Sequence, residues 1–393
     1  MQTVVLAAGQ GTRMRPLTDS LPKPMLPVAG EPLVGHCIEG AIAAGASRVV
    51  VVVGYEGEAV REALSGREWP VPVEFVEQPE QRGTADAVRA ARDALRDGPF
   101  AVLNGDVLYD DSLGDLFESG PAVGSFRVDD PSSYGVLETE GDRVRGVVEK
   151  PDDPPSELVN AGAYVFPEAA LRWLDVEESD RGEMELTDVL QRTCESFDVT
   201  SVPFERWLDV GRPWELLAAN EWKLPETDGR RAGDVSPDAE LRGHVTVERG
   251  AVIEPGAVVE GPVYVSSGAR VGPNAYVRGA TYLGPDAKVG HAVEVKNSVV
   301  MADSHVPHLT YLGDSVLGRG VNLGAGTTVA NLRHDDEPVR VTVKGERVNT
   351  ERRKFGVVCG DDVKTGINST LNAGVTLSPG ATVDPGETVL RDR

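Results

Sequence analysis

The sequence is poor in cysteine, and it contains no long apolar run. Its three cysteines, Cys37, Cys194 and Cys359, lie far apart, so neither a disulfide framework nor a Cys-x-x-Cys metal site is expected. No apolar run reaches the length of about 18 residues that a membrane-spanning helix needs. A secretory signal has a basic segment followed by an apolar stretch. The N-terminus does not show this pattern. These absences favour a cytoplasmic protein with no membrane partner.

Positive charge is also scarce. The 393 residues include 63 Asp and Glu but only 39 Lys and Arg, which gives a formal net charge of −24 at pH 7. Such a charge argues against nucleic acid or an anionic membrane surface as a partner. Only 8 of the cations are Lys, and the acidic residues are spread along the chain. We interpret this pattern as a solvated, salt-adapted surface of the halophilic kind.

The most informative stretch follows the first apolar run, Thr3–Leu6, which predicts a buried strand. Arg13 is placed to fork onto phosphate oxygens, and Lys23, between two prolines, offers a second cation on a stiff segment. A dinucleotide fingerprint needs a third glycine where Met14 stands, and the Gly-Lys-Ser/Thr of a P-loop is absent. Small residues leave room for a ligand to lie against bare backbone. They are Ala7, Ala8, Gly9 and Gly11.

Residues 1–222 alternate short apolar runs with helical patterns. Arg48–Val53 is a continuous β-branched run, typical of a central parallel strand. Further strands are predicted at 71–76 and 100–104, and helices at 32–44, 57–64 and 84–95. This alternation predicts an α/β fold, a Rossmann-like and mostly parallel sheet with ligands at the carboxyl ends of its strands. A polar segment rich in Gly and Pro, 223–238, is predicted to be a linker.

A period of six begins at Leu241, where every sixth residue is aliphatic and Gly and Pro fill the corners. This is the hexapeptide repeat of a parallel β-helix, in which six residues form one flat face of a coil. The register slips by one residue after Val295 and again after Leu312. It breaks for a polar excursion at about 330–356. The region 239–393 is therefore predicted to be a β-helix whose irregular part is functional, because regular repeats suffice for stability.

The N-terminal stretch resembles the signature of sugar-1-phosphate nucleotidylyltransferases, Gly-x-Gly-Thr-Arg-hydrophobic-x-Pro-Leu-Thr followed by Pro-Lys-Pro. Residues 9–18 match its first half and residues 22–28 its second. The resemblance implies transfer of a nucleoside monophosphate from UTP or dTTP to a sugar 1-phosphate, with Arg13 and Lys23 as catalytic residues. It also implies a set of nucleotide-binding residues. These are Leu6, Ala8, Gly9, Gly11, Thr12, Gln78, Gly83 and Thr84.

Other motifs match the same family. Gln78 belongs to a base-binding element, and its amide can donate and accept at once, as a pyrimidine edge requires. The helix from Thr84 is expected to present free N–H groups. By resemblance Asp106 and Asp209 hold Mg²⁺, which accepts one or two carboxylates together with phosphate oxygens and water. The segment around Asp209 looks more like the thymidylyltransferase branch. The implied sugar-phosphate-binding residues are Gly135, Glu149, Lys150 and Asn160.

The segment His308–Asp314, at the register slip, resembles the acetyl-transfer motif of bifunctional N-acetylglucosamine-1-phosphate uridylyltransferases/glucosamine-1-phosphate N-acetyltransferases. Histidine titrates near neutrality, which suits His308 to take the ammonium proton of a sugar amine. The resemblance implies acetyl-coenzyme A (acetyl-CoA) as co-substrate and a left-handed β-helix that forms a homotrimer. The other residues that it implies for this acetyl-transfer site are Arg278, Lys296, Tyr311, Asn322 and Ala325.

The sequence therefore predicts a bifunctional enzyme. It acetylates glucosamine 1-phosphate from acetyl-CoA and then transfers UMP from UTP to N-acetylglucosamine 1-phosphate, giving UDP-N-acetylglucosamine and pyrophosphate. One alternative is a glucose-1-phosphate thymidylyltransferase or uridylyltransferase with a purely structural β-helix, which is open because fold alone does not imply function. A second alternative is a non-catalytic homologue that binds sugar nucleotides for regulation. UTP and dTTP stay undistinguished, because both bases present similar edges to Gln78.

Overall fold

The computed structural model describes residues 1–179 and 182–393. The chain divides into two compact units, and the division does not follow the order of the sequence. Two short N-terminal segments belong to the second unit, although strand β1 and the helices that follow belong to the first. Unit 1 comprises Met1–Gln10, Pro22–Met25 and Pro32–Asp209. Unit 2 comprises Gly11–Leu21, Leu26–Glu31 and Val210–Arg393.

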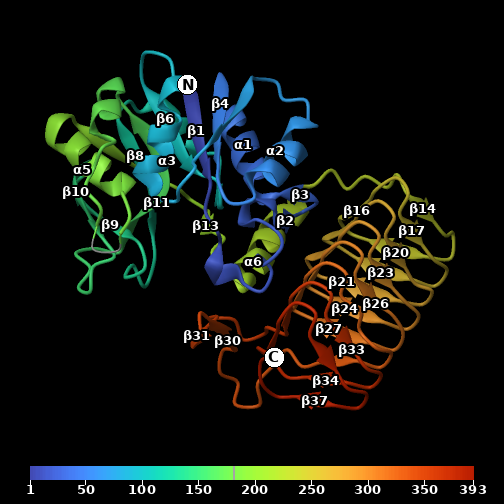
Figure 1. The fold of residues 1–393 in the computed structure, drawn as a ribbon. Coiled ribbons are helices and arrows are strands. Elements are labelled where there is room, and N and C mark those ends of the chain that lie inside the picture. The colour runs from blue at the N-terminus through green and yellow to red at the C-terminus, as the bar shows by residue number, and fades with distance from the viewer. Residues whose placement is uncertain (180–181) are drawn as a thin grey trace. The chain divides into compact units, whose positions relative to one another are not determined.

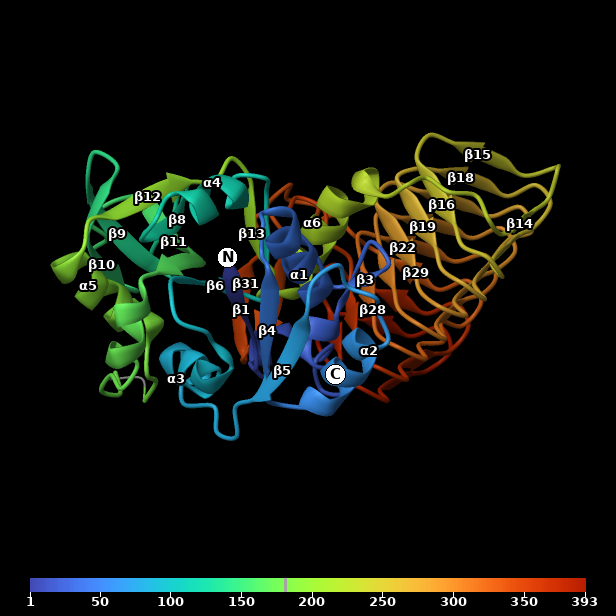
Figure 2. The same ribbon diagram turned by 90° about the horizontal axis from the view of Figure 1, so that it is seen from above.

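Unit 1 is built on one nine-stranded mixed sheet, in the order β5-β4-β1-β6-β11-β8-β12-β10-β9 (Figure 2). The first four strands run parallel to one another. They are β5 (Val73–Glu77), β4 (Arg48–Val53), β1 (Gln2–Ala7) and β6 (Phe100–Asn104). All six residues of β4 are buried, which explains why the run is continuously apolar after Arg48.

The other half of the sheet is mixed, with β12 parallel to β8 and the other neighbouring pairs antiparallel, so the sheet is less parallel than predicted. Strand β11 runs antiparallel to β6 and to β8, and β10 runs antiparallel to β12 and to β9. The sequence did not show this change because strand direction depends on the connection and not on local composition. The strands are β11 (Leu158–Phe166), β8 (Ala122–Arg127), β12 (Val199–Pro203), β10 (Arg143–Glu149) and β9 (Gly135–Glu140).

Helices cover both faces of this sheet, which makes unit 1 a three-layer, Rossmann-like fold. One core, around Val49 and Val51, contains side chains of α1 (Leu33–Ala43), α2 (Gly57–Ser65) and α4 (Leu113–Glu118). The other, around Val50 and Val52, contains side chains of α3 (Thr84–Ala90) and α5 (Leu186–Ser196). Successive residues of β4 thus point to opposite faces.

Unit 2 stacks short parallel strands along three sides, the yellow to red coils of Figure 1. The eight-stranded sheet holds β15 (Glu240–Arg242), β18 (Val258–Glu260), β21 (Tyr276–Arg278), β24 (Glu294–Lys296), β27 (Tyr311–Gly313), β29 (Thr328–Val329), β34 (Thr370–Leu371) and β37 (Thr388–Val389). The seven-stranded sheet holds β16 (Val245–Val247), β19 (Val263–Val265), β22 (Thr281–Leu283), β25 (Val299–Val300), β28 (Val316–Leu317), β32 (Val358–Cys359) and β35 (Thr376–Leu377).

The third side begins with five paired strands, β14 (Asp234–Val235), β17 (Val252–Ile253), β20 (Arg270–Val271), β23 (Lys288–Val289) and β26 (His305–Val306). The pair β33 (Lys364–Thr365) and β36 (Thr382–Val383) follows, joined to β26 through single bridges at Asn322. The strand stack begins with β14, inside the segment 223–238 that was predicted to be a linker.

The register of the strands confirms the predicted repeat. Leu241 pairs with Val259, and Val259 pairs with Val277, so one three-sided coil takes 18 residues. From Tyr282 to its partner Val299 the step is 17 residues, which confirms the one-residue slip. Aliphatic side chains at the repeat positions form one continuous core inside the coils. Each hexapeptide therefore buries its own aliphatic residue, which is the reason for the period.

The polar excursion departs after β29 and forms an antiparallel hairpin, β30 (Arg340–Val343) and β31 (Glu346–Asn349). At its end Phe355 is fully buried, and its ring lies edge-on to that of Trp214, with centroids 6.5 Å apart. Trp214 belongs to α6 (Pro213–Lys223). Helix α6, which the sequence places in the N-terminal domain, is thus part of unit 2.

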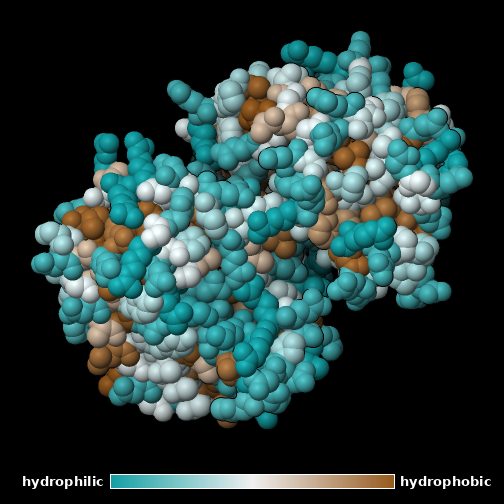
Figure 3. Space-filling view, turned by 180° about the vertical axis from the view of Figure 1, so that it is seen from behind, coloured by the Kyte–Doolittle hydropathy of each residue, from teal (hydrophilic) through white to brown (hydrophobic). Residues whose placement is uncertain are grey.

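The remaining elements are short. Unit 1 has β7 (Val107–Tyr109) and β13 (Trp207–Asp209), and single turns η2 (Lys23–Met25), η3 (Arg92–Ala94) and η4 (Glu168–Trp173). Elsewhere lie η1 (Thr12–Met14), η5 (Leu224–Glu226), β2 (Pro27–Val28) and β3 (Glu31–Pro32). No helix among residues 1–179 and 182–393 is long and apolar enough to cross a membrane. On the face in Figure 3 hydrophilic residues predominate, with small separate apolar patches.

Candidate functional site

The glycine-containing loop leaves β1 at the carboxyl edge of the parallel strands. Ala8 is buried, Gly9 is exposed, and a Cβ on Gly9 would meet nothing within 4 Å. The next strand end is tightly packed, because a Cβ on Gly105 would lie 2.7 Å from the Leu6 carbonyl oxygen. Gln81 Nε2 donates to the Ala8 carbonyl oxygen at 2.6 Å, a contact that no motif indicated. The loop is thus held at Ala8 by the hydrogen bond from Gln81, and its backbone at Gly9 is open to a ligand.

The continuation of this loop belongs to unit 2. Gly11 has φ 64°, in the left-handed region that favours glycine, and it starts the turn η1. Thr18 Oγ1 donates to the Gly11 carbonyl oxygen at 2.9 Å, which closes the segment on itself. Thr12 is half-buried and the Arg13 side chain is exposed. The predicted nucleotide loop is therefore continuous in sequence but divided between the two units.

Three residues that the sequence assigned to catalysis and metal binding come together in unit 1. Strand β13 pairs antiparallel with β7, and this pairing places Asp209 opposite Val107, next to Asp106. The Lys23 side chain is buried, and its Nζ lies 2.5 Å from Asp106 Oδ2 and 3.9 Å from Asp209 Oδ1. Two carboxylates from distant parts of the chain therefore share one ammonium group.

The same pair of carboxylates fits a divalent cation. Within the described part of the chain, no three His, Cys, Asp or Glu side chains are grouped to hold a metal ion. A cation at Asp106 and Asp209 would therefore depend on phosphate oxygens and water for its other ligands. Magnesium accepts such a set, because it keeps several waters and usually takes one or two carboxylates.

The predicted base-binding element is held by its own hydrogen bonds. Gln78 follows β5 and is 4% exposed. Its Nε2 donates to the Gly83 carbonyl oxygen at 3.1 Å and to Asp86 Oδ2 at 2.8 Å. Both donors of the amide therefore position the Gly83 turn, and Oε1 is the atom that can accept from a base.

The start of α3 is covered by the segment 184–186. Gly83 has φ 114°, and a Cβ there would lie 2.4 Å from the Met184 carbonyl oxygen. The N–H of Ala85 donates to that oxygen at 2.9 Å, and the N–H of Leu186 donates to Thr84 Oγ1 at 2.9 Å. The prediction that this helix start presents free N–H groups is therefore wrong for Ala85, because Met184 takes its donor.

The predicted sugar-binding residues lie on β9, β10 and β11 of the mixed half, except Lys150, which directly follows β10. Gly135 stands opposite Glu149 in the β9–β10 pair, and a Cβ on Gly135 would lie 3.0 Å from Glu149 Oε2. Lys150 Nζ lies 3.4 Å from Glu149 Oε1, and Lys150 has φ 45°. Asn160 lies on β11, where its Oδ1 accepts from the Gly162 N–H at 3.0 Å. Because glycine at position 135 has no Cβ, it does not crowd the Glu149 carboxylate.

Two aromatic residues that sequence reasoning missed support this region. Tyr109 Oη donates to the Gly162 carbonyl oxygen at 2.8 Å, and Trp207 Nε1 donates to the Ala161 carbonyl oxygen at 2.8 Å. Burial raises the pKa of Tyr109 well above its usual value, so its hydroxyl remains a donor. The two residues stand opposite each other in the β7–β13 pair, which also carries Asp209. They therefore connect the β7–β13 pair, which ends at Asp209, with residues 161–162 of β11.

In unit 2 the eight-stranded sheet brings together three residues of the predicted acetyl-transfer site. Arg278 pairs with Lys296, and Lys296 pairs with Gly313 on β27, whose first residue, Tyr311, pairs with Glu294. Each cation pairs with a carboxylate: Arg278 Nη2 lies 2.8 Å from Glu294 Oε1 on β24, and Lys296 Nζ lies 2.9 Å from Oδ2 of Asp314, which follows β27. The prediction did not include Glu294.

Asp314 is the centre of a hydrogen-bond network. In the sequence this residue marks only the end of the motif His308–Asp314. It is 3% exposed and has φ 50°. Its Oδ1 accepts from Asn297 Nδ2 at 3.0 Å, and its Oδ2 accepts from Asn331 Nδ2 at 2.6 Å. Asn331 Nδ2 also donates to Tyr311 Oη at 3.1 Å. The charge of the buried carboxylate is thus compensated by Lys296 and two side-chain amides. The carboxylate in turn positions Lys296, which forms a cationic strip with Arg278.

The remaining predicted residues lie at the next corner of the coils. His308 is exposed in the turn between β26 and β27, and its carbonyl oxygen accepts from the Gly326 N–H at 2.8 Å. Asn322 bridges His305 and Lys364 on the third side of the coils. Ala325 is half-buried in the turn that follows. His308 and Ala325 therefore occupy stacked turns, whereas Asn322 lies on a different side of the coils from Tyr311.

Comparisons with known proteins agree with this architecture. Residues 2–224 match the family described as "Nucleotidyl transferase", and residues 259–384 match the "GMPPB C-terminal domain". The "Bifunctional protein GlmU" of Methanococcus vannielii is 39% identical over 95% of this chain and 91% of its own length. A "Bifunctional sugar-1-phosphate nucleotidylyltransferase/acetyltransferase" of Sulfurisphaera tokodaii is 36% identical over 95% of this chain and 94% of its own.

Among solved structures, a putative glucose-1-phosphate thymidylyltransferase from Bacillus anthracis matches with a TM-score of 0.52 and 26% identity. The match covers 56% of this chain and 94% of that one. The fold of unit 1 and the family match over residues 2–224 define a nucleotidyl transferase. More closely, the chain belongs to the family of bifunctional sugar-1-phosphate nucleotidylyltransferases/acetyltransferases, whose members it matches across both units.

Proposed function

We propose that this enzyme acetylates glucosamine 1-phosphate with acetyl-CoA and then couples the product to UTP, giving UDP-N-acetylglucosamine and pyrophosphate. The observation that carries the proposal is the match, over 95% of the chain, to relatives named for both activities. If the relatives matched unit 1 alone, the comparison would suggest no function for the coils. The two carboxylates around Lys23 and the cationic strip of Arg278 and Lys296 give each activity a chemically suitable site.

For nucleotidyl transfer, an oxygen of the sugar phosphate attacks the α-phosphorus, and pyrophosphate leaves. We assign the metal to Asp106 and Asp209, and it would supply charge neutralisation at the phosphates. Lys23 and Arg13 are the catalytic cations that would meet charge developing in the transition state. The nucleotide would lie along Leu6, Ala8, Gly9, Gly11 and Thr12, with its base near Gln78, Gly83 and Thr84. The sugar 1-phosphate would contact Gly135, Glu149, Lys150 and Asn160.

For acetyl transfer, the amine of the sugar attacks the thioester carbon, and coenzyme A leaves as the thiol. We assign His308 as the base that accepts the ammonium proton. Arg278 and Lys296 would pair with the sugar phosphate, and their carboxylate partners Glu294 and Asp314 keep both cations oriented in the meantime. Tyr311 and Asn322 would contact the sugar, and Ala325 the coenzyme. In this assignment the register slip serves to place the His308 turn.

The finer architecture is part of the proposal. Short parallel strands on three sides of an 18-residue coil support a left-handed parallel β-helix for 239–393, with 1–222 as the nucleotidyltransferase domain and 223–238 between them. We expect a homotrimer formed through the coils, which sedimentation equilibrium measures directly. We also expect a cytoplasmic location, where nucleoside triphosphates and acetyl-CoA are made.

A substrate panel tests the proposal. Pyrophosphate release is measured for UTP and dTTP with N-acetylglucosamine 1-phosphate and glucose 1-phosphate, and thiol release is measured for acetyl-CoA with glucosamine 1-phosphate. We expect both signals, with N-acetylglucosamine 1-phosphate and UTP as the best pair. Pyrophosphate without any thiol would favour the single-function alternative, in which the coils are structural. Neither signal with any pair would leave a sugar-nucleotide-binding protein.

A further inference from the structure

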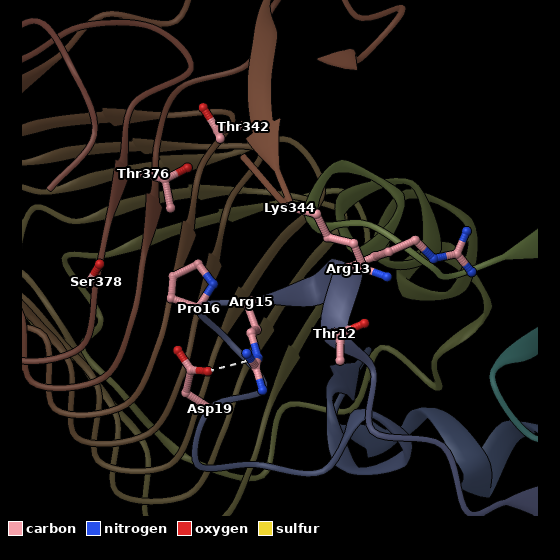
Figure 4. Close-up of a pocket in the computed structure, with 9 residues that line it drawn as sticks. All are labelled: Thr12, Arg13, Arg15, Pro16, Asp19, Thr342, Lys344, Thr376 and Ser378. Carbon is pink, nitrogen blue, oxygen red and sulfur yellow. Dashed lines mark ion pairs between the residues drawn. The ribbon is translucent and has the colours of Figure 1, made fainter. Parts of the chain in front are cut away.

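The polar excursion at 330–356 reaches two places in unit 2. Its hairpin β30–β31 contributes Lys344 to a pocket of about 410 Å³ that Arg13 also lines (Figure 4). That pocket belongs with the proposed nucleotide loop. The two ends of the excursion instead meet Asp314, the buried carboxylate that pairs with a cation of the proposed acetyl-transfer site.

Hydrogen bonds hold both ends of the excursion at this carboxylate. At its start, Asn331 Nδ2 donates to Asp314 Oδ2 at 2.6 Å. At its end, the Phe355 N–H donates to the Asn331 carbonyl oxygen at 3.0 Å. The Gly356 N–H donates to the Asp314 carbonyl oxygen at 2.8 Å. The excursion thus closes beside the residue whose side chain pairs with Lys296.

A second attachment runs through helix α6. Arg352, near the end of the excursion, places two N–H groups on the Glu221 carboxylate, with Nη1 3.2 Å from Oε2 and Nη2 on Oε1. Glu221 Oε1 also accepts from Asn297 Nδ2 at 2.8 Å. The same nitrogen donates to Asp314 Oδ1 at 3.0 Å. Glu221 therefore joins the excursion to Asp314 through one side-chain amide.

This arrangement fixes the direction of the Asn297 amide. An amide carries two donors on its nitrogen and an acceptor oxygen, so only the nitrogen suits two carboxylates at once. With Glu221 and Asp314 both accepting from it, the amide is held on two sides. The Lys296 side chain is 16% exposed and that of Asp314 is 4% exposed. The geometry of this ion pair therefore depends on its protein neighbours more than on water.

We propose that Glu221 is a positioning residue for acetyl transfer, which fixes Asn297 and thereby the Asp314 carboxylate that orients Lys296. The inference rests on the proposed function, in which Lys296 pairs with the phosphate of the sugar. Arg352 is the contribution of the excursion, because it neutralises Glu221 and holds its carboxylate with two hydrogen bonds. The excursion thus serves the acetyl-transfer site from outside it.

Charge alone predicts the opposite result when Glu221 is removed. A carboxylate near a site for an anionic substrate repels that substrate. With a purely electrostatic role, Glu221→Ala would therefore lower the KM for glucosamine 1-phosphate. With a positioning role the KM rises, because Lys296 is less well oriented toward the phosphate. The direction of the change separates the two roles.

The test is steady-state thiol release from acetyl-CoA by the full-length protein. We expect Glu221→Ala to raise the KM for glucosamine 1-phosphate by about three- to tenfold, with the KM for acetyl-CoA unchanged and kcat within about twofold. Glu221→Gln keeps an acceptor for Asn297, so it should restore part of the loss. Arg352→Ala should raise the same KM. The double variant should be no worse than Glu221→Ala, because both residues act through one contact.

Glu226→Ala is the matched control. The Glu226 carboxylate accepts from Trp222 Nε1 at 2.8 Å and from Lys223 Nζ at 2.7 Å, and both partners belong to α6. This variant therefore removes a glutamate that pairs with a cation near the end of the same helix, away from Asn297. Its KM for glucosamine 1-phosphate should equal that of the wild type, and its unfolding midpoint gives the stability cost of such a loss.

An unchanged or lowered KM for glucosamine 1-phosphate in Glu221→Ala overturns the proposal. An equal rise of the KM for both substrates, with an unfolding midpoint below that of Glu226→Ala, also overturns it, because the coils are then damaged as a whole. Absence of thiol release by the wild type overturns the proposed acetyl transfer, and this inference with it. Failure of the positioning role alone leaves the activity of the wild type intact, so the two failures are distinguishable.

Discussion

At the scale of single residues, the main finding is that Lys23 stands between two carboxylates instead of facing a phosphate alone. Its Nζ is nearer to Asp106 than to Asp209, at 2.5 and 3.9 Å. A buried ammonium group needs such partners, because an unpaired buried charge is costly. The arrangement holds the two carboxylates close together before a metal or a nucleotide is bound.

The first prediction concerns this carboxylate pair. Asp106→Asn or Asp209→Asn should lower kcat for pyrophosphate release by about a hundredfold or more, because a metal ligand is lost. Excess chelator should abolish activity in the wild type. The control is Asp111→Asn, an exposed residue on the loop after β7, which should behave as wild type. Full activity in chelator would show that no metal is needed.

The second prediction concerns His308. His308→Ala should lower the rate of thiol release from acetyl-CoA by about a hundredfold or more, because the proton acceptor is removed. Pyrophosphate release should stay near the wild-type rate, because its residues lie elsewhere in the chain. His291 is the matched control. The β23–β26 register places it at the same corner one coil earlier, and it is exposed. Equal loss in both variants would point to damaged coils and not to a base.

The third prediction compares two glycines with the same backbone conformation. Gly83 and Gly98 both have φ 114°, but only at Gly83 would a Cβ meet backbone, 2.4 Å from the Met184 carbonyl oxygen. Both alanine variants share the cost of the strained φ, about 1–3 kcal/mol. Gly83→Ala should also displace residue 184 and lower the calorimetric unfolding midpoint by at least about 4 °C more than Gly98→Ala. Equal midpoints would contradict this packing.

At the scale of elements, the segment Gly11–Leu21 is attached to the coils of unit 2. Arg319 Nη2 donates to the Ser20 carbonyl oxygen at 2.9 Å, and its Nε lies 2.9 Å from Asp361 Oδ2. Ser20 Oγ donates to the same Asp361 oxygen at 2.6 Å. A loop that carries a proposed catalytic arginine is thus positioned by residues about three hundred positions later in the chain.

The fourth prediction follows from this attachment. Arg319→Ala should lower kcat/KM for nucleotidyl transfer by about three- to tenfold, the effect of losing an exposed charged network worth about 1 kcal/mol. Arg319→Lys keeps the charge but not the fork, so it should restore part of the loss. The exposed Arg391→Ala is the control for loss of one positive charge. If Arg319→Ala equals Arg391→Ala, the attachment does not affect the loop.

At the scale of the whole molecule, the dominant feature is the net charge of −24. Self-repulsion at this charge destabilises the compact state, and salt screens it. The fifth prediction is therefore a rise of the unfolding midpoint by about 5–10 °C between 0.1 and 2 M KCl. Most of the rise should occur below about 0.5 M, because the Debye length has by then become short. A midpoint independent of KCl would exclude a salt-adapted surface.

The sequence by itself determined what local pattern controls. Arg48–Val53 and Phe100–Asn104 are strands with the predicted bounds, because strands buried on both faces need continuous apolar runs. The coils follow from the six-residue period, and even the one-residue slip before Val299 was readable. Helix and strand ends elsewhere shift by a few residues. The strand predicted at 71–76 is Val73–Glu77, and the helix predicted at 84–95 ends at Ala90 before a separate turn.

Only the tertiary structure decided what depends on distant partners. Asp209 reaches Lys23 through the β7–β13 pairing, which no local pattern encodes. Glu294 looks like an ordinary coil residue, and Asp314 like the end of a motif, until the register places them beside Arg278 and Lys296. The Gly11–Leu21 segment belongs to the coils through Arg319 and not to the strand that precedes it. Such contacts are fixed by long-range packing, whose free energy can override local preference along the chain.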